Sequence, residues 1–143
     1  MRNDLTSFFH VMQNSGYLVE RIRDLDGYVN KLLGNATIFS IYEKGELAAV
    51  SACYINDPDK ILAYVSYIGV LPKFQRRGFA SNLLDSSINY AQRCRLKIIR
   101  LEVSSDNTAA KKLYENKGFV CEKFIDNSIF MELSLNDFRS SNM

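Results

Sequence analysis

The chain opens with apolar residues at helical spacing. In the first run these residues are Leu5, Phe8, Phe9 and Met12. Intervals of three and four residues place them on one face of an amphipathic helix. A second run with the same period extends from Ile22 to Leu33 and is followed by Gly34-Asn35, a pair typical of a helix C-terminus. The pattern therefore predicts two N-terminal helices.

Strand-like runs come next. Residues 36–43 and 46–55 are rich in β-branched and aromatic residues, and the pair Lys44-Gly45 between them favours a hairpin turn. After a turn at 57–60, a third strand is predicted over about 61–71. Gly69 lies inside this strand, where glycine indicates a β-bulge or the close approach of another backbone.

The pattern then alternates between helix and strand. Apolar and small residues recur at helical spacing from Ala80 to Cys94, which predicts an amphipathic helix beginning near Gln75. Residues 97–105 alternate between apolar and polar, which predicts a strand. A strand–helix–strand unit of this length implies parallel strands joined by a right-handed crossover.

A short helix and a hairpin complete the pattern. The segment DNTAAKKLYENKGF (106–119) begins with N-cap side chains, and Gly118-Phe119 resembles a left-handed C-terminal cap. Strands at 120–125 and 128–133 would turn at Asp126-Asn127. Because no repeat or linker divides the sequence, we expect a single domain over residues 1–143 of the α+β class.

Composition excludes several classes of protein. With 47% hydrophobic and 24% charged residues, the chain of 143 residues is typical of a soluble globular protein. A net charge of +2 is too small to favour nucleic-acid binding, and no apolar run is long enough to cross a membrane. The cysteines Cys53, Cys94 and Cys121 lack zinc-ligand spacing, and His10 is the single histidine. We therefore expect reduced thiols in a cytoplasmic protein, and no metal site.

The predicted helix start near Gln75 contains unfavourable residues. Arg76 and Arg77 add positive charge where the helix dipole is already positive, and Gly78 lowers helix propensity by about 1 kcal/mol. A bound anion would explain both choices, because first-turn N–H groups point outward and glycine permits close approach. The alternative is that the arginines are solvated and the glycine is incidental. The stretch matches neither a Walker loop nor a dinucleotide-binding fingerprint.

The same stretch, VLPKFQRRGFASNLL (70–84), resembles the acyl-CoA-binding segment of the GCN5-related N-acetyltransferases, the GNAT family. The family pattern Gln/Arg-x-x-Gly-x-Gly/Ala is met by residues 75–80. A second family segment is similar to residues 101–119, with matches at Leu101, Val103, Asn107, Ala110, Leu113, Tyr114, Gly118 and Phe119. The resemblance runs from about Ile38 to Leu133. It implies a GNAT-like, three-layer fold with a mixed, centrally splayed sheet flanked by helices.

The resemblance also implies how acetyl-CoA would bind. The CoA diphosphate would bind to backbone N–H groups of the loop, and the pantetheine arm would pair with the preceding strand, in the slot opened by a bulge at Gly69. A backbone N–H near Val70 would stabilise the oxyanion of the attacked thioester. The residues implied in cofactor binding are Ile68, Gly69, Val70, Gln75, Arg76, Arg77, Gly78, Phe79, Ala80, Ser81, Asn107 and Tyr114.

Two residues are implied in catalysis. Tyr114 matches the family tyrosine that donates a proton to the CoA sulfur; alternatively it only packs on the sheet. Glu102 resembles the base proposed in ribosomal-protein N-terminal acetyltransferases; alternatively it is an exposed glutamate paired with Arg100 or another cation. Asn107 would bind the cofactor arm, cap its helix, or do both.

Some members of the family carry a strand carboxylate at about the position of Tyr64, and this chain has no acid there. Tyr64, Ser66 and Tyr67 are therefore candidates for positioning a water relay. The absence of that carboxylate also leaves open a second function, a non-catalytic acyl-CoA-binding or sensor module. A nucleic-acid-binding module is disfavoured by the near-neutral charge.

The leading hypothesis is an acetyl-CoA-dependent N-acetyltransferase that acts on a primary amine by direct attack on the thioester. The acceptor is not identified by the sequence: a peptide N-terminus, lysine, an amino sugar, a polyamine and an antibiotic all fit. The resemblance implies an acceptor cleft built largely from about Asp4–Asn35 and Glu122–Ser128. The resemblance also makes a homodimer plausible. No nucleic-acid, membrane or metal partner is expected.

Overall fold

The computed structural model describes residues 1–16 and 22–135 of the chain. These residues form two compact units: Met1–Ala52 with Tyr67–Leu84, and Cys53–Ser66 with Asp85–Met143. Strands β2 (Glu46–Tyr54) and β3 (Leu62–Val70) and helix α3 (Phe79–Arg93) each pass from one unit into the other. The prediction of a single domain stays a prediction.

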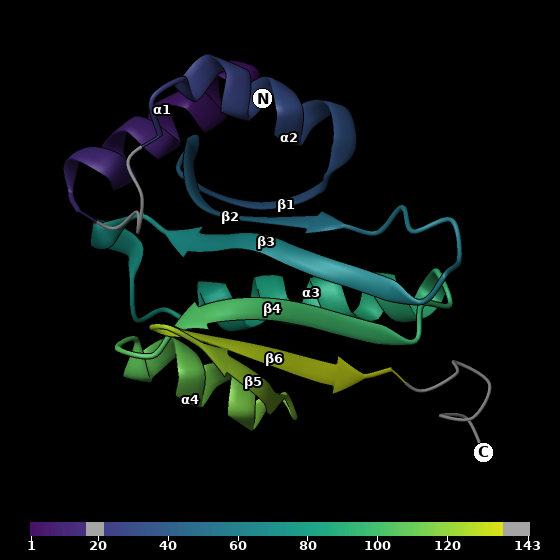
Figure 1. The fold of residues 1–143 in the computed structure, drawn as a ribbon. Coiled ribbons are helices and arrows are strands. Elements are labelled where there is room, and N and C mark those ends of the chain that lie inside the picture. Colours follow the sequence, from purple (N-terminus) through teal and green to yellow (C-terminus); the bar gives the residue numbers. More distant parts are fainter. Residues whose placement is uncertain (17–21, 136–143) are drawn as a thin grey trace. The chain divides into compact units, whose positions relative to one another are not determined.

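The first unit combines two helices with a hairpin (Figure 1). Helices α1 (Arg2–Asn14) and α2 (Leu25–Asn35) precede strands β1 (Thr37–Glu43) and β2 (Glu46–Tyr54). The predicted apolar faces of both helices are buried in one cluster with residues of β2. In the hairpin turn, Lys44 and Gly45 have φ values of 48° and 82°, which suits the twist of the strands they join.

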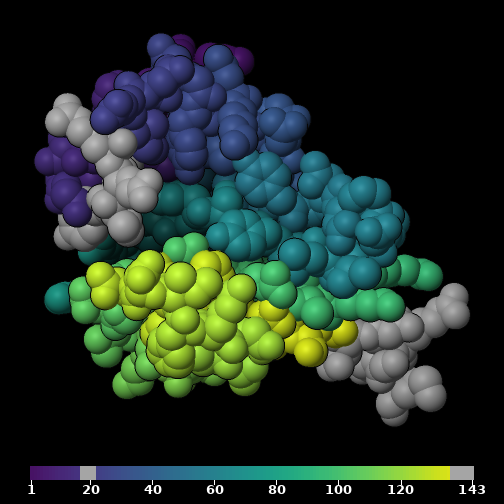
Figure 2. Space-filling model, in the orientation of Figure 1, coloured from purple at the N-terminus to yellow at the C-terminus, as the bar shows by residue number. Residues whose placement is uncertain are grey.

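The second unit contains β4 (Ile98–Ser104), α4 (Thr108–Asn116), β5 (Val120–Ile125) and β6 (Ser128–Ser134). Strand β6 pairs antiparallel with both β4 and β5. One face of these strands is buried, and its residues are Ile99, Leu101, Val103, Ile129 and Met131. Every residue of β5 is exposed, and the yellow-green hairpin forms part of the surface in Figure 2.

The strands form a mixed six-stranded sheet in the order β1-β2-β3-β4-β6-β5. Strand β3 pairs parallel with β4, and α3 connects the two strands in the chain, as the strand–helix–strand pattern predicts. This pairing is described for Leu62–Val65 with Ile98–Leu101, whereas β3 itself continues to Val70 and β4 to Ser104. The fold class expected from the sequence is confirmed.

The predicted start of the third helix near Gln75 is wrong. A 3₁₀ turn at Pro72–Phe74 follows β3, and α3 begins only at Phe79. Between them, Arg76 and Gly78 have φ values of 67° and 80°, in the left-handed region that a right-handed helix cannot contain. The two arginines therefore lie in a loop before the helix, so the expected conflict with its first turn does not arise.

The structure explains the glycine at position 69 by a contact that the sequence did not indicate. A Cβ atom at this position would overlap the hydroxyl of Tyr67, two residues earlier on the same strand. The expected bulge at Gly69 stays a prediction. A register irregularity is described instead on β5, between Cys121 and Lys123.

Candidate active site

The loop before α3 presents a row of backbone N–H groups. No backbone N–H from Arg76 to Ser81 donates a hydrogen bond to the described residues, and the first helical bond runs from Asn82 N to Gly78 O at 3.0 Å. Such unpaired groups at a helix start are where anions bind, because the helix dipole adds to the donors. The loop residues predicted to bind cofactor thus lie together in the first unit.

The loop is attached to the end of β3. Gln75 Nε2 donates to Val70 O at 3.2 Å, and Leu71 N donates to Ala48 O at 2.8 Å, which joins this end to β2. The predicted residues Ile68, Gly69 and Val70 are therefore held in fixed geometry relative to the loop.

Cations surround the loop. The Lys73 ammonium lies 5.2 Å and the Arg77 guanidinium 5.3 Å from the centre of the Phe74 ring. Lys73 also pairs with Glu46 at 2.6 Å. Arg76 is exposed and forms no ion pair with the described residues. An anion at the loop would therefore meet both donors and positive charge.

In the second unit, Glu102 lies on the polar face of β4. Its carboxylate accepts a hydrogen bond from Ser128 Oγ at 2.8 Å. Arg100 does not pair with it, because the Arg100 guanidinium contacts the Glu132 carboxylate, with Nε 2.6 Å from Oε2. Glu102 is exposed, as the alternative reading expects, but the ion pair described for Arg100 is with Glu132.

Tyr64 lies close to the charged groups of Glu102 and Arg100. It lies opposite Arg100 in the β3–β4 register. Burial raises the pKa of Tyr64, the charge of Glu102 raises it further, and Arg100 opposes both effects. Its hydroxyl is therefore protonated at neutral pH on the strand beside Glu102, where a family carboxylate is absent.

Helix α4 carries Asn107 and Tyr114. Asn107 is the N-cap, and its Oδ1 accepts from Ala110 N at 3.1 Å, which confirms the capping interpretation. Tyr114 is only 6% exposed and packs against Phe119 with ring centres 6.0 Å apart. Burial raises the pKa of Tyr114 to about 12. Nothing among the described residues hydrogen-bonds to its hydroxyl, so a proton stays available there.

Tyr67 is the third tyrosine of interest. Its hydroxyl is buried and has no hydrogen-bond partner among residues 1–16 and 22–135. The ring packs against Phe8 and Phe9 of α1, with centres 6.3 Å and 5.0 Å apart. Burial raises the pKa of this hydroxyl, so it too is neutral.

Sequence reasoning missed the surroundings of Glu102. Ser128, Phe130 and Glu132 reach β4 through the β4–β6 register. The predicted hairpin turn at Asp126-Asn127 could have located β6. The register between β6 and β4 cannot be predicted from the local sequence, because α4 and β5 separate the two strands in the chain.

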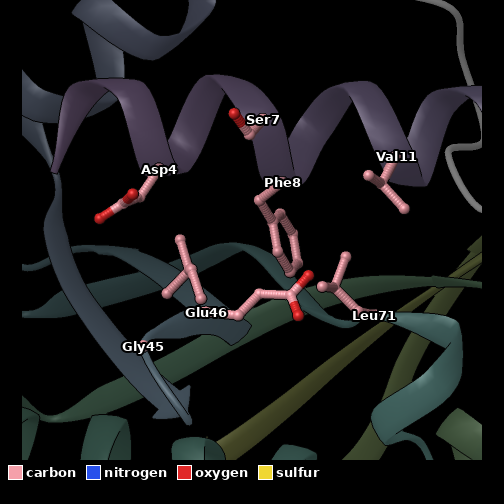
Figure 3. Close-up of a pocket in the computed structure, with 8 residues that line it drawn as sticks. Asp4, Ser7, Phe8, Val11, Gly45, Glu46 and Leu71 are labelled. Carbon is pink, nitrogen blue, oxygen red and sulfur yellow. The ribbon is translucent and has the colours of Figure 1, made fainter.

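A pocket of about 210 Å³ opens in the first unit between α1 and the β1–β2 turn (Figure 3). Phe8, Val11 and Leu71 form its apolar lining, and Asp4 and Glu46 lie at its sides. Asp4 accepts from the Tyr42 hydroxyl at 2.8 Å, and Glu46 pairs with Lys73. None of the predicted site residues lines this pocket.

Among the described residues, no three His, Cys, Asp or Glu side chains are grouped so that they could hold a metal ion. No helix in the same part of the chain is long and apolar enough to cross a membrane.

Comparison with known proteins identifies the family. The model of the acetyltransferase (GNAT) family matches residues 1–119. The chain belongs to the GNAT family. A curated GNAT relative, the [ribosomal protein bS18]-alanine N-acetyltransferase of Haemophilus ducreyi, is 42% identical over 52 residues. This match covers 36% of the present chain and 36% of that protein, so it spans about a third of each.

Solved GNAT structures share the fold over nearly the whole chain. The ribosomal-protein-S18-alanine N-acetyltransferase of Escherichia coli has a TM-score of 0.77 at 24% identity, covering 94% of this chain and 89% of that one. An acetyltransferase of Salmonella typhimurium, solved with its cofactor acetyl-CoA, has a TM-score of 0.76 at 20% identity and covers 96% and 91%.

Proposed function

We propose that this protein transfers the acetyl group of acetyl-CoA to a primary amine by direct attack of the amine on the thioester. Family membership supports the reaction type, and a structural neighbour was solved with acetyl-CoA. The observation that carries the proposal is the row of unpaired N–H groups from Arg76 to Ser81, which suits a diphosphate.

Acetyl-CoA binding uses the first unit. The diphosphate accepts from the loop N–H groups, with Arg76 and Arg77 supplying charge-assisted contacts. The pantetheine arm lies along Ile68–Val70 as an added strand. The Val70 N–H polarises the thioester carbonyl, where negative charge develops during attack.

Proton transfer uses the second unit. Glu102 removes a proton from the acceptor ammonium, directly or through water held by Tyr64, so that the nitrogen lone pair can attack. The new N–C bond forms, the C–S bond breaks, and Tyr114 donates its hydroxyl proton to the departing sulfur. The second proton lost by the nitrogen returns to the Tyr114 phenolate through water, which restores the acid. Because burial raises the pKa of Tyr114 to about 12, this acid stays protonated until the pH approaches that value.

A panel of amines tests the proposal by thiol release from acetyl-CoA, with affinity measured by calorimetry. We expect Tyr114→Phe to lower kcat about 10- to 100-fold and to leave the acetyl-CoA Kd within about threefold, since only the proton is lost. The control is Tyr54→Phe, on β2 of the same unit, whose hydroxyl forms no hydrogen bond with described residues. An unchanged rate in Tyr114→Phe would remove that residue from the mechanism.

A non-catalytic acyl-CoA sensor is the second candidate, favoured by Tyr64 at a position where the family resemblance implies a carboxylate in some members. It predicts tight acetyl-CoA binding with no turnover of any amine. The same calorimetry and thiol assay distinguish the two functions.

A further inference from the structure

A row of three side chains crosses the polar face of the second unit. Glu102 on β4 lies opposite Phe130 on β6, and Phe130 lies opposite Lys123 on β5. Directly opposed residues on neighbouring strands point to the same face. Because strands are spaced about 4.8 Å apart, the backbones of Glu102 and Lys123 are separated by about 10 Å.

The charges at the two ends of this row are not neutralised within the described chain. Glu102 accepts one hydrogen bond from Ser128, and no ion pair joins it to the described residues. Lys123 is exposed and has no carboxylate partner there either. The remaining charges of the face, Arg100 and Glu132, pair with each other.

Phe130 provides an apolar surface between the two charges. Its ring is half-buried, and the Lys123 ammonium lies 5.2 Å from the ring centre. A cation–π contact of this kind holds the lysine side chain over the ring without consuming its charge. The row therefore presents a carboxylate, an apolar ring and an ammonium in sequence.

We propose that the Glu102–Phe130–Lys123 row binds the acceptor, and that the acceptor is a primary amine carrying an anionic group within about 10 Å of its nitrogen. The amine lies at Glu102, the apolar spacer lies on Phe130, and the carboxylate or phosphate pairs with Lys123. This assignment rests on the proposed function, because the amine must lie where Glu102 can take its proton.

Charge complementarity is the reason for this choice of acceptor. A plain alkylamine would satisfy Glu102 and leave the Lys123 ammonium unpaired. A second cationic group on the acceptor would meet Lys123 as a like charge, which disfavours polyamines. An anionic group satisfies both ends of the row with one ligand.

Three probes, each with a six-carbon chain, test this inference: hexylamine, 6-aminohexanoate and 6-aminohexyl phosphate. In the wild type we expect kcat/KM to be about 5-fold higher for each anionic amine than for hexylamine, a preference that weakens as salt is added. Lys123→Gln should abolish the preference, lowering kcat/KM for both anionic amines to about the value for hexylamine measured in the same variant. The control Lys112→Gln, an exposed position on α4, should retain it.

The carboxylate and phosphate arms identify which anion the row favours. An equal preference in wild type and Lys123→Gln, or no preference for the anionic amines in the wild type, would overturn the inference. Transfer to other amines but to none of the three probes would overturn the acceptor class alone. Absence of both acetyl-CoA binding and transfer to any amine would overturn the proposed function with it.

Discussion

The loop before α3 and the polar face of β4, β6 and β5 differ in how they can bind a ligand. The loop offers backbone N–H groups, and its shape depends on the left-handed residues Arg76 and Gly78. The face offers side chains instead, Glu102 on β4 and Lys123 next to the register irregularity of β5. A cofactor common to a whole family suits the first arrangement, whereas an acceptor that varies between members suits the second.

The largest effect is expected on the face. Glu102→Gln keeps the size of the side chain and a hydrogen bond to Ser128 but cannot accept the acceptor's proton. We expect kcat to fall about 100- to 1,000-fold, as for loss of a general base, while the acetyl-CoA Kd is unchanged. Steady-state kinetics and calorimetry measure the two quantities.

Glu115→Gln, an exposed substitution on α4, is the control for a changed net charge. A kcat within threefold of wild type for Glu102→Gln would show that another group removes the proton. A raised acetyl-CoA Kd would instead contradict the division of roles between the face and the loop.

Periodicity was sufficient to predict the elements of the fold and their order. The apolar faces of α1 and β4 follow from residue spacing alone, since each is buried within its own unit. The start of α3 was placed too early because Arg76 is a non-glycine residue with positive φ, a conformation that few residue types favour. An arginine at position 76 does not by itself indicate a positive φ.

The loop and the polar face were predictable to different degrees. Gly78 and its neighbours form a local motif, so the loop was recognised from contiguous residues. The surroundings of Glu102 come from β6 and β5, more distant in the chain, and depend on a strand register set by tertiary pairing. Glu102 was therefore identified as a candidate, and the resemblance gave only the range Glu122–Ser128 for the hairpin, whereas Phe130 was not identified.

A smaller effect is expected in the loop. Gly78 has φ of 80°, and a Cβ added there would meet no atom within 4 Å, so Gly78→Ala introduces backbone strain without a clash. The strain is about 1 kcal/mol, and relieving it would turn the loop N–H groups away from the diphosphate. We expect the acetyl-CoA Kd to rise about 10-fold, with kcat at saturation little changed.

Gly45→Ala is a matched control in the same unit. Gly45 has φ of 82° and equally open space, but it lies in the β1–β2 turn. Both variants should lose similar thermal stability, and only Gly78→Ala should bind acetyl-CoA more weakly. Equal affinities in the two variants would contradict diphosphate binding by the loop.

Asn107 can be tested for its two roles separately. Asn107→Asp keeps the capping oxygen that accepts from Ala110 N but removes the amide donor. We expect unchanged thermal stability. The acetyl-CoA Kd should rise about threefold, because one hydrogen bond to the cofactor is lost. Asn107→Ala should also lose about 1 kcal/mol of stability through the missing cap.

Asp24→Ala supplies the comparison, since Asp24 caps α2 by accepting from Gly27 N at 2.9 Å. It should lose similar stability with no change in acetyl-CoA affinity. If Asn107→Asp also binds acetyl-CoA normally, Asn107 is a helix cap and nothing more.

The smallest effect is expected at Tyr67, where stability should rise. Its buried hydroxyl has no partner among the described residues, and an unpaired buried polar group costs about 1 kcal/mol or more. Tyr67→Phe removes that group and keeps the ring contacts with Phe8 and Phe9. We expect the midpoint of thermal unfolding to rise by about 2–4 °C.

Tyr42→Phe is the control for Tyr67→Phe, because it removes a tyrosine hydroxyl that does have a partner, the Asp4 carboxylate. It should be slightly destabilised in the same measurement. A destabilised Tyr67→Phe would mean that the hydroxyl is paired in solution. A normal midpoint with reduced turnover would instead place Tyr67 among the groups that position the acceptor.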